Sequence, residues 1–240
     1  VFGKNNYEIF KTPIPQDDPL DWKDAKTYKN RLKEARKKTG MNCGIMVVTT
    51  KINNINITAC ASDFAFIGGS VGAAEGEAIL YGIQHAIENN QPFINFCSGG
   101  GMRMFESLIA LSQMTRTTLA INELKKNNLP YIVVLCDPVA GGITASYAML
   151  GDLHLAEKDS LIAFAGARVI QGTVKEELPE GFQKSEYVEK TGFVDLVLER
   201  KDLREKIGSI LSILLKKSSA INSVTNETPE DDTTLTKAAS

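Results

Sequence analysis

Glycines cluster at three places in this chain, each where an apolar, strand-like run ends. The three turns contain Gly68-Gly69, Gly99-Gly100-Gly101 and Gly141-Gly142, and each is followed by a segment of helical character. The start of a helix offers unpaired backbone N–H groups and the positive end of a dipole, which together favour a bound negative charge. The turns therefore indicate either a site whose ligand approaches the main chain or tight turns that pack helices onto a sheet.

Other glycine motifs do not account for these turns. No glycine run leads into Gly-Lys-Ser or Gly-Lys-Thr, which excludes a phosphate-binding loop, and the spacing does not match the dinucleotide fingerprint. The segment from Gly68 to Gly72 matches the G-x-S-x-G pattern of serine hydrolases, with Ser70 as the nucleophile. Asp137 or Asp152 could supply the acid, and His154 is the only histidine that follows them in the chain. No cluster of acids and bases is evident. This favours chemistry in which backbone donors stabilise an oxyanion and the substrates supply the reactive groups.

Strands and helices alternate along the part of the chain that carries the turns. Strands are predicted at 43–52, 55–67, 93–101, 130–142, 153–157, 160–166 and 194–199. Helices are predicted at 24–38, 73–89, 103–126, 143–150, 168–177, 183–190 and 201–217. Repeated strand–turn–helix units predict an α/β fold whose helices pack against a sheet.

Composition and charge describe an ordinary globular chain with polar ends. We expect an extended lead-in over 1–22, one domain over 23–217 and a disordered, acidic tail over 218–240. The formal net charge of −2 argues against a general attraction to nucleic acid or anionic membranes. No apolar run approaches the length of a membrane span. The four cysteines form no C-x-x-C pair, so no metal site is predicted within these residues, and reduced thiols indicate a cytosolic-type compartment.

Four longer segments resemble the β subunit of bacterial or plastid acetyl-CoA carboxylase carboxyltransferase. They are "FAFIGGSVG", "GGGMRMFESLIALSQM", "LPYIVVLCDPVAGGITASYAMLGDLHLAE" and "LIAFAGARVIQGTVKEELPEGFQKSEYVEKTGFVDLVLER", and the likeness runs from about Asp18 to Lys217. The resemblance implies a crotonase-type fold, a spiral of ββα units. It also implies transfer of a carboxyl group from carboxybiotin to acetyl-CoA, giving malonyl-CoA in the first committed step of fatty acid biosynthesis.

The resemblance also implies partners and cofactors. Biotin is expected on a separate biotin carboxyl carrier protein, and a carboxyltransferase α subunit is expected to complete a heterotetramer in the cytoplasm or the plastid stroma. The family carries zinc in an N-terminal four-cysteine ribbon that these residues lack. Because the chain begins at Val1, we expect truncation upstream of the domain, with true loss of the ribbon as the alternative.

Site residues follow from the resemblance by position. The family's Ser-Gly-Gly-Ala-Arg falls on residues 99–103, and its paired glycines before "ASYAML" fall on 141–142. We predict that the oxyanion-hole or close-approach backbone for a thioester enolate, with biotin as the base, comes from Gly100, Gly101, Gly141 and Gly142. The candidate substrate-binding residues are Gly68, Gly69, Arg103 and Gly166. Arg103 is expected to anchor CoA or a subunit interface, or else to be a surface charge at a helix start.

Three positions depart from the family pattern. Gly99 replaces a serine, Met102 replaces an alanine and Ala167 replaces a proline. The changes at positions 99 and 102 keep open the alternative of a catalytically degenerate scaffold subunit, beside the serine hydrolase.

Overall fold

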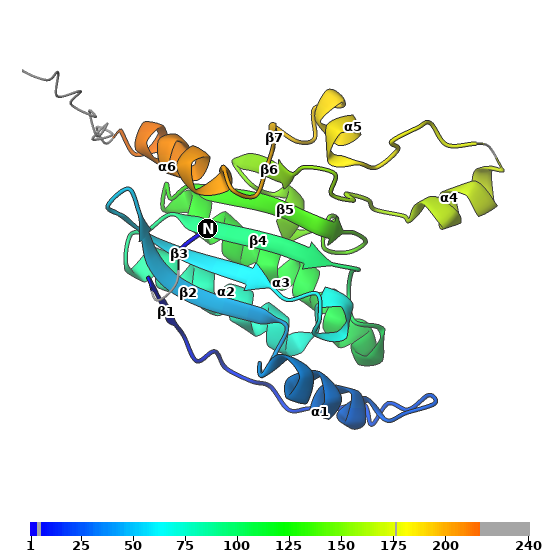
Figure 1. The fold of residues 1–240 in the computed structure, drawn as a ribbon. Helices are drawn as coiled ribbons and strands as arrows, with labels where there is room; N and C mark the ends of the chain where they lie inside the picture. Colours follow the sequence, from blue (N-terminus) through cyan, green and yellow to red (C-terminus); the bar gives the residue numbers. More distant parts are fainter. Residues whose placement is uncertain (4–5, 176, 217–240) are drawn as a thin grey trace, which may run out of the picture.

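A seven-stranded sheet forms the centre of the molecule in the computed structural model, which describes residues 1–3, 6–175 and 177–216 (Figure 1). The strands pair in chain order: β1 (Tyr7–Ile9), β2 (Ile45–Ile52), β3 (Ile55–Ser62), β4 (Phe93–Gly99), β5 (Tyr131–Val139), β6 (Leu153–Glu157) and β7 (Leu196–Leu198). The pairs β1–β2 and β2–β3 are antiparallel, whereas β3 to β7 run parallel. Parallel strands end at the same edge of a sheet, so the loops after β3, β4 and β5 are brought together there.

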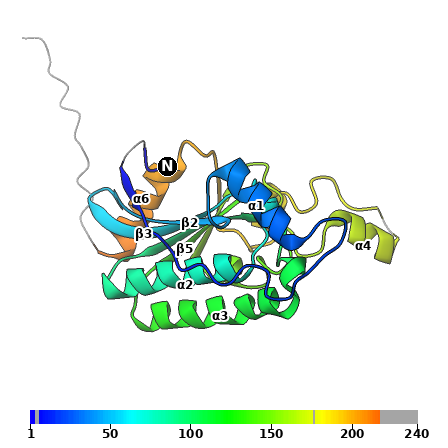
Figure 2. The same ribbon diagram turned by 90° about the horizontal axis from the view of Figure 1, so that it is seen from below.

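Helices cover both faces of the sheet: the long crossover helices between parallel strands lie on one face, and the C-terminal helix lies on the other. The helices α2 (Ala73–Glu88) and α3 (Ser107–Lys126) lie side by side under one face, and α6 (Leu203–Leu214) packs on the other (Figures 1 and 2). The helix α1 (Tyr28–Thr39) packs against the 3-10 turn η1 (Ile67–Gly69). The helix α4 (Ala167–Val174) projects from the body, and α5 (Ser185–Lys190) contacts β7.

Alternating side chains of the central strands build two cores. In β5, Tyr131, Val133 and Leu135 point into the core beneath α2 and α3, whereas Ile132 and Val134 point into the core beneath α6. All five side chains are completely buried. This period of two explains why the strand is apolar at every position of its first half: a strand covered on both faces has no solvent side.

The predicted strand over 55–67 ends earlier than expected, at Ser62. Asp63 accepts a hydrogen bond from the Ala65 N–H at 2.8 Å, and Ile67 has a φ of 48°. An aspartate that bonds the backbone two residues ahead starts a turn rather than continuing a strand. The first glycine turn therefore lies within the 3-10 turn η1, after a turn at 64–66, and does not follow the strand directly.

Two other predicted elements are not formed. Residues 143–150 form turns and the 3-10 helix η3 (Tyr147–Met149) instead of an α-helix. The Thr144 and Ser146 hydroxyls bond the Gly141 and Gly142 carbonyls, at 2.8 and 2.6 Å, and such bonds compete with helical ones. Residues 160–166 contribute only isolated bridges, from Leu161 and Ile162, instead of a strand.

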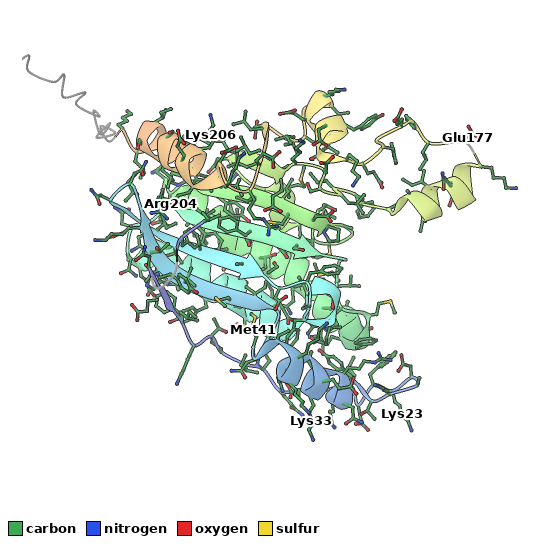
Figure 3. The ribbon with its side chains drawn as sticks, viewed as in Figure 1. Lys23, Lys33, Met41, Glu177, Arg204 and Lys206 are labelled. Carbon is green, nitrogen blue, oxygen red and sulfur yellow. The ribbon has the colours of Figure 1, made fainter. Side chains whose placement is uncertain are left out.

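The ends of the chain and the helix boundaries differ in detail from the predictions. The predicted lead-in contains the edge strand β1, and α3 begins at Ser107, after the 3-10 helix η2 (Met104–Glu106). Gly40 ends α1 in a left-handed conformation, which confirms the predicted stop. The basic surface around α1 is exposed, with Lys23 and Lys33 pointing outward (Figure 3). The predicted tail at 218–240 lies outside the described residues.

Candidate active site

The three glycine turns meet at the carboxyl edge of the sheet. The Gly100 N–H donates to the Gly68 carbonyl at 3.1 Å, which joins the second turn to the first. The Ala140 N–H donates to the Gly99 carbonyl at 3.0 Å, which joins the third turn to the second. The backbone of each turn therefore fixes the position of the next.

Two of the glycines are required by the closeness of these turns. Gly69 has a φ of 63°, and a Cβ there would lie 2.6 Å from the Ser98 carbonyl oxygen. A Cβ on Gly99 would collide with the Gly69 carbonyl oxygen and would lie 2.7 Å from the Ile143 side chain. This backbone therefore accommodates a glycine at position 99. Gly99 is one of the three departures from the resembled family.

The N–H groups of the predicted oxyanion glycines are not equivalent. The Gly100 N–H is taken up by the bond described above, and the Gly141 N–H donates to the Phe164 carbonyl at 3.1 Å. In contrast, the N–H groups of Gly101 and Gly142 donate to no carbonyl or side chain in the part of the chain that the structure describes. A Cβ built on Gly101 would lie 3.5 Å from the Gly142 nitrogen, so the two glycines lie side by side.

Of the four glycines predicted as oxyanion donors, only Gly101 and Gly142 have an N–H group that is available to a ligand. Gly141 is a close-approach residue instead, because a Cβ there would lie 3.2 Å from the Gly100 carbonyl oxygen, whereas a Cβ on Gly100 would come no closer than 3.8 Å to another residue. Two backbone N–H groups that border one space can hold a developing oxyanion, such as the enolate oxygen of a thioester. The sequence could not separate the four, since the acceptors of the occupied donors come from distant segments.

The predicted substrate-binding glycines have different surroundings. Gly68 is exposed beside the joined turns, whereas Gly69 is buried within them. Gly166 precedes α4, and a Cβ there would meet no atom within 4 Å. The geometry therefore gives Gly166 no close approach comparable with that of the turn glycines.

Arg103 lies in the interior, with only 2% of its surface exposed. Its guanidinium pairs with Glu75 at 2.8 Å and with Glu106 at 3.4 Å. Burial is the largest single effect and would lower the pKa of Arg103, but the charge of Glu75, the effect of Tyr28 and the hydrogen bonds to both together raise the pKa, so the group stays protonated. The prediction that Arg103 is a surface charge at a helix start is wrong. The guanidinium is occupied by protein groups and is not presented to CoA or to a partner's surface.

Ser70 has no catalytic base beside it in the described structure. Its Oγ donates to the Ile67 carbonyl at 2.8 Å and accepts from Arg103 Nε at 3.2 Å. His154, the residue that a hydrolase would need, lies in β6, where its Nε2 accepts from the Gly151 N–H at 3.1 Å. The serine hydrolase alternative is therefore not supported by the geometry.

We expect a fluorophosphonate probe to leave Ser70 unmodified, because no imidazole activates its hydroxyl. Intact-mass measurement after labelling checks this, with an active serine hydrolase labelled in parallel as the control. Stoichiometric labelling that disappears in Ser70→Ala would contradict the expectation.

A pocket of about 690 Å³, which the sequence did not predict, opens next to the third turn. Thr144 and Phe164 line it and also contact Gly141, through the hydrogen bonds Thr144 Oγ1 to Gly141 O and Gly141 N to Phe164 O. Its other aromatic lining residues are Phe182, Tyr187 and Phe193. These residues come from loops and short elements without a periodic pattern, which is why no signal in the sequence indicated them.

Within residues 1–3, 6–175 and 177–216, no three His, Cys, Asp or Glu side chains lie close enough together to hold a metal ion. Over the same ranges, no helix combines the length and the apolar character needed to cross a membrane.

The chain is similar throughout to proteins of known type. The carboxyl transferase domain family matches residues 21–239. The acetyl-coenzyme A carboxylase carboxyl transferase subunit beta of Pelagibacter ubique is 82% identical over 240 residues, which are 100% of this chain and 78% of that protein. The corresponding protein of Caulobacter vibrioides is 50% identical over 215 residues, 90% of this chain and 70% of that protein.

Solved structures share the fold. Transcarboxylase 12S, crystallised with methylmalonyl-coenzyme A, has a TM-score of 0.64 at 25% identity, over 70% of this chain and 32% of that chain. The Pseudomonas malonate decarboxylase MdcD–MdcE hetero-dimer has a TM-score of 0.64 at 22% identity, over 75% of this chain and 85% of that chain. The predicted crotonase-type α/β fold is confirmed.

Proposed function

Because the chain belongs to the β subunits of acetyl-CoA carboxylase carboxyltransferase, we propose that its joined glycine turns form the acetyl-CoA half of the carboxyl-transfer site. The identity of 82% over the whole chain confirms the predicted family and its carboxyl transferase activity. The placement of the substrate at these turns is our own inference. It is carried by one observation: Gly101 and Gly142, whose N–H groups have no partner among the described residues, lie side by side.

The N–H pair matches the chemistry of the reaction. Removal of a proton from the methyl carbon of acetyl-CoA leaves negative charge on the thioester oxygen, and two fixed N–H donors stabilise that charge. The donors are held in place before the substrate binds, since the surrounding backbone bonds join the turns. One such donor is worth about 3 kcal/mol of transition-state stabilisation in other enzymes.

The turns themselves carry no free carboxylate or imidazole. Their side chains at 68–72, 99–103 and 140–144 include Ser70, Arg103 and Thr144, all of which bond protein groups. This favours a base from outside the chain. Biotin on a separate carrier protein would supply both the carboxyl group and that base, while this chain binds and orients the thioester.

We further propose that a carboxyltransferase α subunit completes the site. The isolated chain should then form malonyl-CoA at least about a hundredfold more slowly than the complex, because the carrier-bound biotin is not held next to the thioester. The assay measures malonyl-CoA from carboxylated carrier protein and acetyl-CoA with the chain alone, with the α subunit alone and with both.

The outcomes separate the alternatives. Full activity of the chain alone would contradict the need for an α subunit. A stable complex that forms no malonyl-CoA would instead support the catalytically degenerate scaffold.

A further inference from the structure

The buried guanidinium of Arg103 engages all three of its nitrogens, through four hydrogen bonds and an ion pair with Glu75. Nε donates to Ser70 Oγ at 3.2 Å. One terminal nitrogen donates to the Ser70 carbonyl and pairs with Glu75. The other donates to the Tyr28 hydroxyl at 3.0 Å and to Glu106 at 3.4 Å. A lysine carries three donors on a single nitrogen and cannot reproduce this planar fork.

These bonds connect the first and second glycine turns. Ser70 belongs to the first turn and is held through both its hydroxyl and its carbonyl. The neighbouring Val71 accepts from the Arg103 N–H at 2.8 Å and donates to the Gly101 carbonyl at 3.0 Å. Gly101 is thus bonded to Val71, and Arg103 bonds both Val71 and the neighbouring Ser70. The direction of the Gly101 N–H therefore depends on the positions of Ser70 and Val71.

Backbone N–H donors offset the excess negative charge of the cluster around Arg103. Glu75 and Glu106 together exceed the single guanidinium charge. Glu75 accepts from the Gly44 and Gly72 N–H groups at 2.8 and 2.9 Å, and Glu106 accepts from the Ala73 N–H at 2.6 Å. Two of these donors lie at the first residues of α2, where the helix dipole also favours negative charge. The anchor is thus a fully bonded, rigid unit.

We propose that Arg103 is a positioning residue for carboxyl transfer, which aims the Gly101 N–H at the thioester oxygen by holding Ser70 and Val71. The inference rests on the proposed role of Gly101 and Gly142 as oxyanion donors. Arg103 does not touch the substrate. Its loss therefore lowers the rate of the chemical step and leaves the binding of the CoA moiety unchanged.

The test is Arg103→Lys in the complex with the α subunit. Lysine keeps the positive charge between Glu75 and Glu106 but loses the fork to Ser70. We expect kcat per folded complex to fall by about tenfold or more, with the KM for acetyl-CoA within about twofold of wild type. Arg200→Lys is the matched control. Arg200 also donates to a glutamate, Glu157, through two of its nitrogens, but the Arg200 side chain is 76% exposed.

Two results would overturn the proposal. An unchanged kcat per folded complex would show that Arg103 has only a structural role. A raised KM with unchanged kcat would show that Arg103 contributes to the binding of CoA. Ser70→Ala decides the matter if Arg103→Lys does not fold: a several-fold lower kcat with unchanged KM supports positioning, and an unchanged kcat overturns it. Failure of the proposed function is distinct, since the wild-type complex would then form no malonyl-CoA or Gly101→Ala would retain full kcat.

Discussion

Gly101→Ala is expected to slow malonyl-CoA formation by about a hundredfold or more, in a protein that still folds and pairs with its α subunit. The added methyl group would lie 3.5 Å from the Gly142 nitrogen, within the space where we place the thioester oxygen. It would also force an alanine into a φ of 127°, which turns the Gly101 N–H away from its present direction. Both effects remove transition-state stabilisation, and a hundredfold loss corresponds to about 2.7 kcal/mol.

Turnover per folded complex, measured beside a melting curve, tests this expectation. Gly40→Ala is the matched control: Gly40 also has a positive φ, 72°, but a Cβ there would meet no atom within 4 Å, and it lies at the end of α1. Both variants should lose some stability from backbone strain. If Gly101→Ala loses activity only as much as it loses folded protein, the glycine is a turn residue and not a donor.

The second large effect is expected in stability. Glu75→Ala should lower the free energy of unfolding by about 3–5 kcal/mol, because it breaks a fully buried ion pair and leaves only the longer contact with Glu106 for the Arg103 guanidinium. Both side chains are only 1% exposed, and the N–H groups of Gly44 and Gly72 would also lose their acceptor. For a chain of this size the melting temperature should fall by roughly 10 °C.

Thermal unfolding followed by circular dichroism checks this value. Glu34→Ala removes an exposed carboxylate that pairs with Lys26, at side-chain exposures of 61% and 55%, and should change the free energy by less than about 1 kcal/mol. Equal effects of the two substitutions would show that the buried cluster contributes no more than a surface pair.

Local patterns in the sequence were sufficient for the elements that carry the site. Strands such as β4 and β5, and the helices α2 and α3, follow from apolar runs, helical periodicity and glycine turns at their junctions. The stop of α1 at Gly40 is a local property of one residue. Where side-chain hydroxyls bonded the backbone, as at Thr144 and Ser146, the local pattern led to a helix that is not formed.

Partners from distant segments could not be predicted. Arg103 resembles a charged residue at a helix start, and only the fold brings Glu75 and Tyr28 to it. In the same way, four similar glycines could be proposed as donors, but the carbonyls of Gly68 and Phe164 decide which N–H groups stay free. The family resemblance located the turns, whereas the choice between donors needed the three-dimensional arrangement.

The bonds between the glycine turns also bear on how the protein folds. The turns follow three different strands, and the hydrogen bonds from Gly100 to Gly68 and from Ala140 to Gly99 each close a long loop of chain. Closing such loops costs entropy before the contacts repay it, and contacts between distant residues form slowly. The N–H pair therefore comes into existence only after β3, β4 and β5 have paired. A chain still emerging from the ribosome, or one opened locally at β5, has the glycines of the turns but not the arrangement that we propose as the site.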